Sequence, residues 1–103
     1  NPGLLSVAFI YNIMNLYLHE KVIIVTGGAK GIGEAISQVL ASEGAMIALV
    51  GRNEADNRLA VEKIQAVGGH AFAFTAELTQ PDQCQKAIDD IVSTFGRIDG
   101  LVN

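Results

Sequence analysis

The stretch Lys21–Ala35, KVIIVTGGAKGIGEA, joins an apolar run, a cluster of glycines and the start of a periodic apolar pattern. Val22–Val25 is continuously apolar and stops at Thr26, which is typical of a buried strand. Apolar side chains then return at helical spacing: they are Ile32, Ala35, Ile36, Val39 and Leu40. The stretch therefore predicts a strand, a glycine-rich turn and the beginning of a helix.

The turn between this strand and this helix has the composition of a phosphate-binding site. Backbone N–H groups and the positive end of the helix dipole converge there. A side chain at Gly27 or Gly31 would keep a pyrophosphate away from the chain, and one at Gly33 would push the helix off the strand. The phosphate loop of nucleotide hydrolases is disfavoured, because its Lys precedes Ser or Thr, whereas Lys30 precedes Gly31.

The rest of the chain alternates apolar strands with helical patterns. Further strands are expected at Met46–Val50 and Ala71–Thr75, and a fourth begins within Ile98–Asn103. Strands that are apolar on both faces and separated by helices indicate a parallel sheet covered on both sides. Right-handed crossovers then give the strand order 3-2-1-4. This is the first half of a doubly wound α/β (Rossmann) fold, which binds dinucleotides.

Helix ends carry recognisable signals. Gly44 suits the C-terminal end of the first helix. Asn53 is expected to cap a second helix over Glu54–Val67, with Asp56 in the position of a capping box. The inward side chains of that helix are expected to be Leu59, Ala60, Ile64 and Val67. Thr79 is expected to cap the third helix.

Composition limits the class of protein. A chain of 103 residues is long enough for one domain, and its net charge of −4 argues against a nucleic-acid partner. The single cysteine, Cys84, excludes an internal disulfide and fits a reducing compartment, so we expect a cytoplasmic protein. His19 and His70 are isolated in the sequence, so no metal site is expected.

The order of residues in the turn, T-G-x-x-x-G-x-G over Thr26–Gly33, resembles the nucleotide-binding turn of the short-chain dehydrogenase/reductase family. The resemblance covers Leu16–Asn103. It implies an oxidoreductase that uses NAD or NADP and a small-molecule substrate, and a complete protein that assembles as a homo-oligomer. The turn residues that it assigns to the cofactor are Thr26, Gly27, Lys30, Gly31, Ile32 and Gly33.

The end of the second strand points to NADP as the cofactor, with NAD as the alternative. An NAD site commonly has Asp or Glu about 20 residues past the glycines, where it accepts hydrogen bonds from the ribose. Gly51 stands there, followed by Arg52 and Asn53. Arg52 could bind a 2′-phosphate through charge-assisted hydrogen bonds, and Lys30 adds a second positive charge. The plain alternative is that both cations are solvated surface residues. Asp56 is assigned to the helix cap.

Two further positions match the family. Glu77-Leu78 stands where the family usually has Asp and an apolar residue near the adenine, although Glu is one methylene longer. The alternative for Glu77 is a solvated loop residue. Gly100-Leu101-Val102-Asn103 resembles the start of the family's L-V-N-N-A-G segment, which approaches the adenosine ribose, and only its first Asn, Asn103, is present.

None of the family's catalytic residues is assigned here. The family uses a Ser, a further Asn and a Tyr-x-x-x-Lys pair, whereas Tyr11 and Tyr17 are followed four residues later by Asn15 and Lys21 and precede the first strand. We therefore interpret the chain as the N-terminal part of a longer enzyme, truncated before its catalytic half.

The activity implied is hydride transfer between NADP(H) and a carbonyl or alcohol. Sugar or polyol dehydrogenation and 3-oxoacyl reduction both stay open. Glu77-Leu78-Thr79 with Gln83-Cys84 loosely resembles sugar dehydrogenases of the L-fucose type. The competing functions are a non-catalytic nucleotide-sensing module and an α/β domain without a ligand.

The first residues differ in character from the rest. Residues 1–13 are apolar from Leu4 to Ile10 but lack Lys and Arg, so they match neither a signal peptide nor a membrane span. We expect the dinucleotide-binding domain over residues 14–103, beginning at Met14, and an upstream or non-core extension over residues 1–13.

Overall fold

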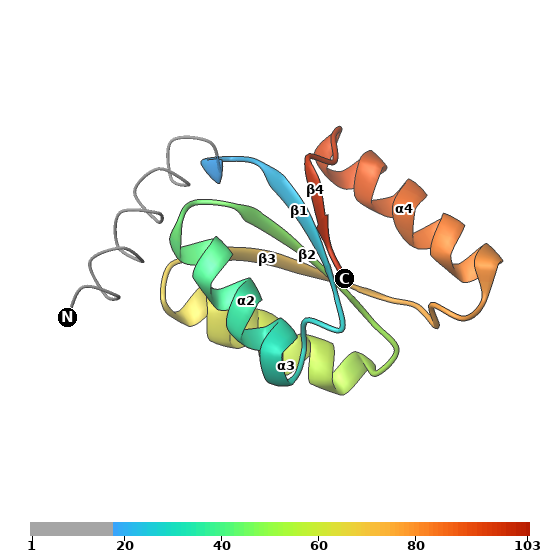
Figure 1. Cartoon of the computed structure of the whole chain (residues 1–103), viewed down its shortest axis with the longest axis horizontal. Coiled ribbons are helices and arrows are strands. Elements are labelled where there is room, and N and C mark those ends of the chain that lie inside the picture. The colour runs from blue at the N-terminus through green and yellow to red at the C-terminus, as the bar shows by residue number, and fades with distance from the viewer. Residues whose placement is uncertain (1–17) are drawn as a thin grey trace.

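The computed structural model describes residues 18–103, whose elements alternate between strands and helices (Figure 1). The strands are β1 Val22–Thr26, β2 Met46–Gly51, β3 His70–Thr75 and β4 Gly100–Val102. The helices are α2 Gly31–Ser42, α3 Glu54–Ala66 and α4 Pro81–Phe95. The predicted element order is confirmed, although β4 begins at Gly100, two residues later than the expected start at Ile98.

The four strands form one parallel sheet in the order β3-β2-β1-β4, as predicted. Val22 lies beside Met46, and Met46 lies beside His70. On its other side, β1 pairs with β4 through Ile23 and Gly100. The chain thus places its first strand between the second and the fourth, which is the arrangement of a doubly wound half-sheet.

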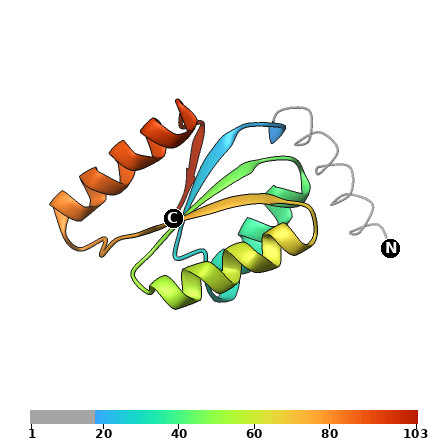
Figure 2. The ribbon, with the colours of Figure 1, turned by 180° about the vertical axis from the view of Figure 1, so that it is seen from behind.

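Helices cover both faces of the sheet, and alternate strand residues face the two sides. Figures 1 and 2 show α2 and α3 on one side and α4 on the other. The core beneath α2 and α3 contains Ile23, Val25, Leu40, Ala41, Ala45, Ile47, Leu49, Ala60, Ile64 and Ala71. The core on the α4 side contains Val22, Ile24, Ala48, Val50, Ala76, Ala87 and Ile91. Burial on both faces explains why the strands are continuously apolar.

The helix ends confirm some of the predicted caps and correct one. Gly44 follows Glu43, the C-cap of α2, and adopts a positive φ of 91°, as a terminating glycine does. The Asn53 side chain caps α3 by accepting from the N–H of Asp56 at 3.0 Å. The prediction that Thr79 caps α4 is wrong. The N-cap is Gln80, without a side-chain bond, because the Thr79 hydroxyl bonds the carboxylate of Glu77 at 3.2 Å.

Two inward residues predicted for α3 are also wrong. Ala60 and Ile64 are buried, but Leu59 is 56% exposed and Val67 is 81% exposed. Ala60 and Ile64 are four residues apart and share one face of the helix, whereas Leu59 lies on a neighbouring face. Val67 follows the last residue of α3 and no longer shares its periodicity.

Asp99 fastens the start of β4 to the start of β1. Its N–H donates to the Val22 carbonyl at 2.8 Å, and its carboxylate accepts from the Val22 N–H at 2.8 Å. Arg97 donates to the other carboxylate oxygen. These hydrogen bonds, with that from Arg97 the largest cause, hold the pKa of the Asp99 carboxyl below its ordinary value of 3.8.

Residues 1–13, which were predicted to form an extension, lie outside the described residues. Tyr11 and Tyr17 lie outside them as well. Between residues 18 and 103, no helix combines the length and the apolar character needed to cross a bilayer.

Candidate functional site

The glycine-rich turn joins the carboxyl end of β1 to α2. Gly27 and Gly31 have positive φ values of 65° and 59°, a conformation that glycine adopts without strain. A Cβ at either position would have no atom within 4 Å, so the space in front of both glycines is open. A Cβ at Gly33 would collide with the Gly27 carbonyl oxygen. Gly33 therefore lets α2 lie close to the turn, whereas the sequence led us to expect a side chain there to push the helix off the strand.

Gly28 is a structural residue that the motif did not single out. A Cβ there would collide with the Leu49 side chain and lie 2.8 Å from the Ser37 hydroxyl. Ser37 is fully buried and donates to the Gly33 carbonyl at 2.8 Å. The turn therefore packs closely against the Leu49 side chain of β2. The only sequence signal was the adjacent pair of glycines.

The first turn of α2 begins beside this open space and contains backbone donors without a backbone acceptor. Its N-cap, Lys30, is extended and gives no side-chain cap. The first helical bond runs from the N–H of Glu34 to the Lys30 carbonyl at 3.3 Å. Within the chain from residue 18 onward, the N–H groups of Gly31, Ile32 and Gly33 have no backbone acceptor. Such donors, with the helix dipole behind them, suit an anionic group.

A cavity of about 260 Å³ lies between this turn and the end of β2. Its lining includes four predicted site residues: Gly27, Lys30, Arg52 and Asn53. The structure therefore brings together the two cations that the sequence proposed for a 2′-phosphate. Lys30 is not isolated, because its Nζ lies 3.0 Å from the Asp56 carboxylate. Among residues 18–103, Arg52 forms no ion pair.

The assignment of Asp56 to the helix cap needs a correction. Its N–H completes the cap by donating to Asn53, but its carboxylate turns to Lys30 and does not return to the Asn53 backbone. The cavity contact, and not a capping box, therefore fixes this side chain. The sequence could not distinguish the two, because both place an acid at the third position of the helix.

Asn57 explains why glycine occupies position 51. The Asn57 side chain is 1% exposed and donates to the Gly51 carbonyl at 3.0 Å. A Cβ at Gly51 would lie 2.5 Å from the Asn57 Oδ1 atom. The buried amide thus takes the space in which a carboxylate for NAD would begin. Asn57 was missed by sequence reasoning because a polar residue within a helix gives no signal of burial.

The remaining predicted residues lie at neighbouring strand ends. The Thr26 hydroxyl is 2.8 Å from the Asn103 Oδ1 atom, so these two residues link the ends of β1 and β4. After β3, Glu77 bonds the backbone and hydroxyl of Thr79, and Leu78 is 42% exposed. Ile32 is 80% exposed beside the glycine turn. Neither Glu77 nor Leu78 lines the cavity that holds Arg52.

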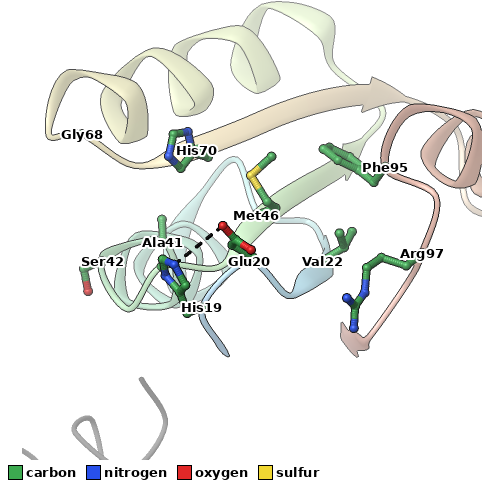
Figure 3. Close-up of a pocket in the computed structure, with 11 residues that line it drawn as sticks. His19, Glu20, Val22, Ala41, Ser42, Met46, Gly68, His70, Phe95 and Arg97 are labelled. Atoms are coloured by element: carbon green, nitrogen blue, oxygen red, sulfur yellow. Dashed lines mark ion pairs between the residues drawn. The ribbon is translucent and has the colours of Figure 1, made fainter. Parts of the chain in front are cut away.

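A second cavity, of about 520 Å³, lies at the amino ends of the strands, opposite to the glycine turn (Figure 3). Its lining includes His19, Met46, His70, Phe95 and Arg97, and a contact of 3.8 Å joins His19 to Glu20. In open α/β sheets, ligands bind beyond the carboxyl ends of the strands. The glycine turn and the smaller cavity, and not this one, have that position.

No metal or nucleophile is apparent in the described part of the chain. Residues 18–103 contain no group of three His, Cys, Asp or Glu side chains that could hold a metal ion. The Cys84 thiol donates to the Leu78 carbonyl at 3.2 Å, so it serves the loop before α4.

Comparison with known proteins places the turn and the sheet in a family. A family model described as short chain dehydrogenase matches residues 21–103. The chain is 41% identical over 93 residues to the short-chain dehydrogenase/reductase homolog YusS of Bacillus subtilis (strain 168), and the match covers 89% of this chain and 81% of YusS.

Two similar solved structures contain the phosphorylated cofactor. A metagenomic short-chain oxidoreductase in complex with NADP is 33% identical, with a TM-score of 0.79, over 82% of this chain and 38% of that one. L-sorbose reductase from Gluconobacter frateurii, complexed with NADPH and L-sorbose, is 31% identical, with a TM-score of 0.80, over 84% of this chain and 33% of that one.

The chain belongs to the short-chain dehydrogenase/reductase family. It spans between 25% and 35% of the length of seven further curated relatives. The looser resemblance to L-fucose-type sugar dehydrogenases finds no support in these relatives.

Proposed function

We propose that residues 21–103 form the NADP(H)-binding portion of an oxidoreductase that moves a hydride between this cofactor and a carbonyl or alcohol. The observation that carries the proposal is the charge at the end of β2. Gly51 offers no carboxylate to a ribose, and the next residue, Arg52, lines the cavity beside the glycine turn. A doubly charged 2′-phosphate would meet the Arg52 cation at the strand end where an NAD site commonly has an acid.

The residues present fit such a cofactor. The open space before Gly27 and Gly31, with the N–H groups that begin α2, suits a pyrophosphate. Arg52 and Lys30 would hold the 2′-phosphate, and Asn103 and Thr26 lie at the strand ends where the adenosine ribose would pass. The nicotinamide supplies the hydride chemistry, and this part of the protein binds and orients the cofactor.

Cofactor binding by the full-length natural protein tests the proposal. Titration calorimetry should give tighter binding of NADP⁺ than of NAD⁺. Arg52→Gln should weaken NADP⁺ binding about tenfold, because charge-assisted hydrogen bonds are lost, and should leave NAD⁺ binding nearly unchanged. Arg58→Gln is the matched control, since Arg58 is an exposed cation of α3 outside the cavity lining. Equal affinities for the two cofactors would overturn the NADP preference.

Turnover separates an oxidoreductase from a nucleotide sensor. The full-length protein would be mixed with NADPH and a panel of ketoses, polyol precursors and 3-oxoacyl thioesters, while the absorbance of reduced nicotinamide is followed. Ketoses belong in the panel because one structural relative was solved with L-sorbose. Substrate-dependent loss of absorbance supports the enzyme. Tight binding without turnover on any substrate would favour the sensor.

A further inference from the structure

An acidic side chain lies among the cations of the proposed 2′-phosphate site. The Lys30 Nζ atom is 3.0 Å from the Asp56 Oδ2 atom, and both residues line the 260 Å³ cavity together with Arg52. The Lys30 side chain is 77% exposed, whereas that of Asp56 is 29% exposed. The carboxylate is therefore the more enclosed partner of the pair.

Asp56 is also the better anchored partner. Its N–H donates to the Asn53 side chain at 3.0 Å, which fixes the first turn of α3. The next residue, Asn57, is buried and holds the Gly51 carbonyl at 3.0 Å. The backbone of Asp56 is therefore held in place and its short side chain keeps the carboxylate near the cavity, whereas the long and exposed side chain of Lys30 can swing away.

This arrangement affects the two cofactors differently. A 2′-phosphate must attract Lys30 away from Asp56 and must also approach the negative carboxylate. The uncharged ribose hydroxyls of NAD do neither, and they can donate to a carboxylate oxygen. Asp56 thus opposes NADP while Arg52 favours it.

We propose that Asp56 is a specificity-determining residue that limits the preference for NADP over NAD by holding Lys30 in an ion pair at the mouth of the ribose cavity. The inference rests on the proposed function, because it takes this cavity to be the site of the adenosine ribose. Lys30 can then bind the 2′-phosphate only after it leaves the carboxylate of Asp56.

The test is calorimetric titration of full-length protein with NADP⁺, NAD⁺ and 2′,5′-ADP at low salt, where exposed charges are least screened. Asp56→Asn should tighten NADP⁺ and 2′,5′-ADP binding about two- to fivefold, the range of an exposed ion pair, and should not tighten NAD⁺ binding. Asp90→Asn is the matched control. It breaks the Lys86–Asp90 pair of 2.9 Å on α4, changes the net charge equally and should alter neither affinity.

A second variant tests how far Asp56 acts through Lys30. Lys30→Gln should weaken NADP⁺ binding, and Asp56→Asn should tighten it less in the Lys30→Gln background than in wild type, because Asp56 acts partly through Lys30 and partly by repelling the phosphate directly. Unchanged or weaker NADP⁺ binding by folded Asp56→Asn would overturn the inference alone. If wild-type protein bound neither dinucleotide, the proposed function would fall, and this inference with it.

Discussion

At the scale of single residues, the site is shaped by positions where a side chain would not fit. Gly33 and Gly51 are both enclosed, one by the Gly27 carbonyl and the other by the Asn57 amide. The sequence indicated that Gly33 permits close packing, because the glycine spacing of a βα turn has a known geometric reason, but it did not identify the Gly27 carbonyl as the contact. It could not reveal the second, since Asn57 is six residues from Gly51 and gives no motif.

Gly33→Ala should destabilise the protein even though Ala is the better helix former by about 1 kcal/mol. The added Cβ collides with the backbone carbonyl oxygen of Gly27, and such overpacking costs about 1–3 kcal/mol. Urea unfolding would measure the loss of stability, and NADP⁺ titration would measure the loss of cofactor affinity. Gly68→Ala is the control: it strains a positive φ of 87° outside the site, so it should lower stability without altering cofactor affinity. Full NADP⁺ binding by Gly33→Ala would contradict the assigned geometry.

Gly51→Asp is expected to shift preference toward NAD only when Asn57 makes room for it. Alone, the aspartate collides with the buried amide. Asn57→Ala alone removes one of the two donors to the Gly51 carbonyl, which still accepts from the Ala76 N–H at 3.0 Å, so the lost hydrogen bond should cost about 0.5–1.5 kcal/mol. The double variant should therefore be more stable than the sum of the single effects predicts. Unfolding free energies of all four proteins give the coupling directly. Strict additivity would show that Asn57 does not restrict position 51.

At the scale of elements, most of the order was predictable and the contacts between elements were not. Strand and helix patterns in this sequence are strongly periodic, and parallel sheets follow from their alternation. Lys30 pairs with Asp56, and Thr79 bonds Glu77, where local rules had assigned Asp56 and Thr79 to backbone groups at helix ends. Such pairings depend on the conformations of the loops, which local sequence rules do not give.

The attachment of β4 to β1 should weaken in acid. Folding lowers the pKa of Asp99, so the ionised carboxylate stabilises the fold when the pH is above the ordinary pKa of 3.8. This contribution is lost as the pH falls through the lower pKa of the folded state. Asp99→Asn should therefore lower the melting temperature at about pH 6, and the difference from wild type should shrink as the pH falls below the ordinary pKa of 3.8. Melting curves across that range would show it. Glu62→Gln, an exposed change on α3, should follow the wild-type profile. A constant gap at every pH would exclude this role.

At the scale of the whole molecule, the α4 side of the sheet is incompletely covered. Five large apolar side chains there are between 37% and 62% exposed: Phe72, Ile88, Val92, Ile98 and Leu101. Leu101 lies on β4 beside Ile24, which is buried. Exposed apolar surface near a sheet edge promotes association between copies.

Residues 1–103 produced alone are therefore expected to be poorly soluble or partly unfolded. Leu101→Gln should raise the soluble fraction, because it removes an exposed apolar group next to the sheet edge. Val67→Gln is the matched control, since Val67 is 81% exposed at the end of α3, away from β4. Size-exclusion chromatography and thermal unfolding would compare the three chains. A sharp cooperative melt of a monomeric wild-type chain would contradict the expectation.

The position of β4 beside β1 has a consequence for the order in which the sheet assembles and opens. The bond between Val22 and Asp99 joins residues 77 positions apart, whereas β1, β2 and β3 follow one another closely in the chain. Closing so long a loop for a strand of three residues is entropically costly and returns few contacts. In deuterated water, the β4 amides should exchange their protons well before those in the middle of β1 and β2, so the last strand made is also the first one released.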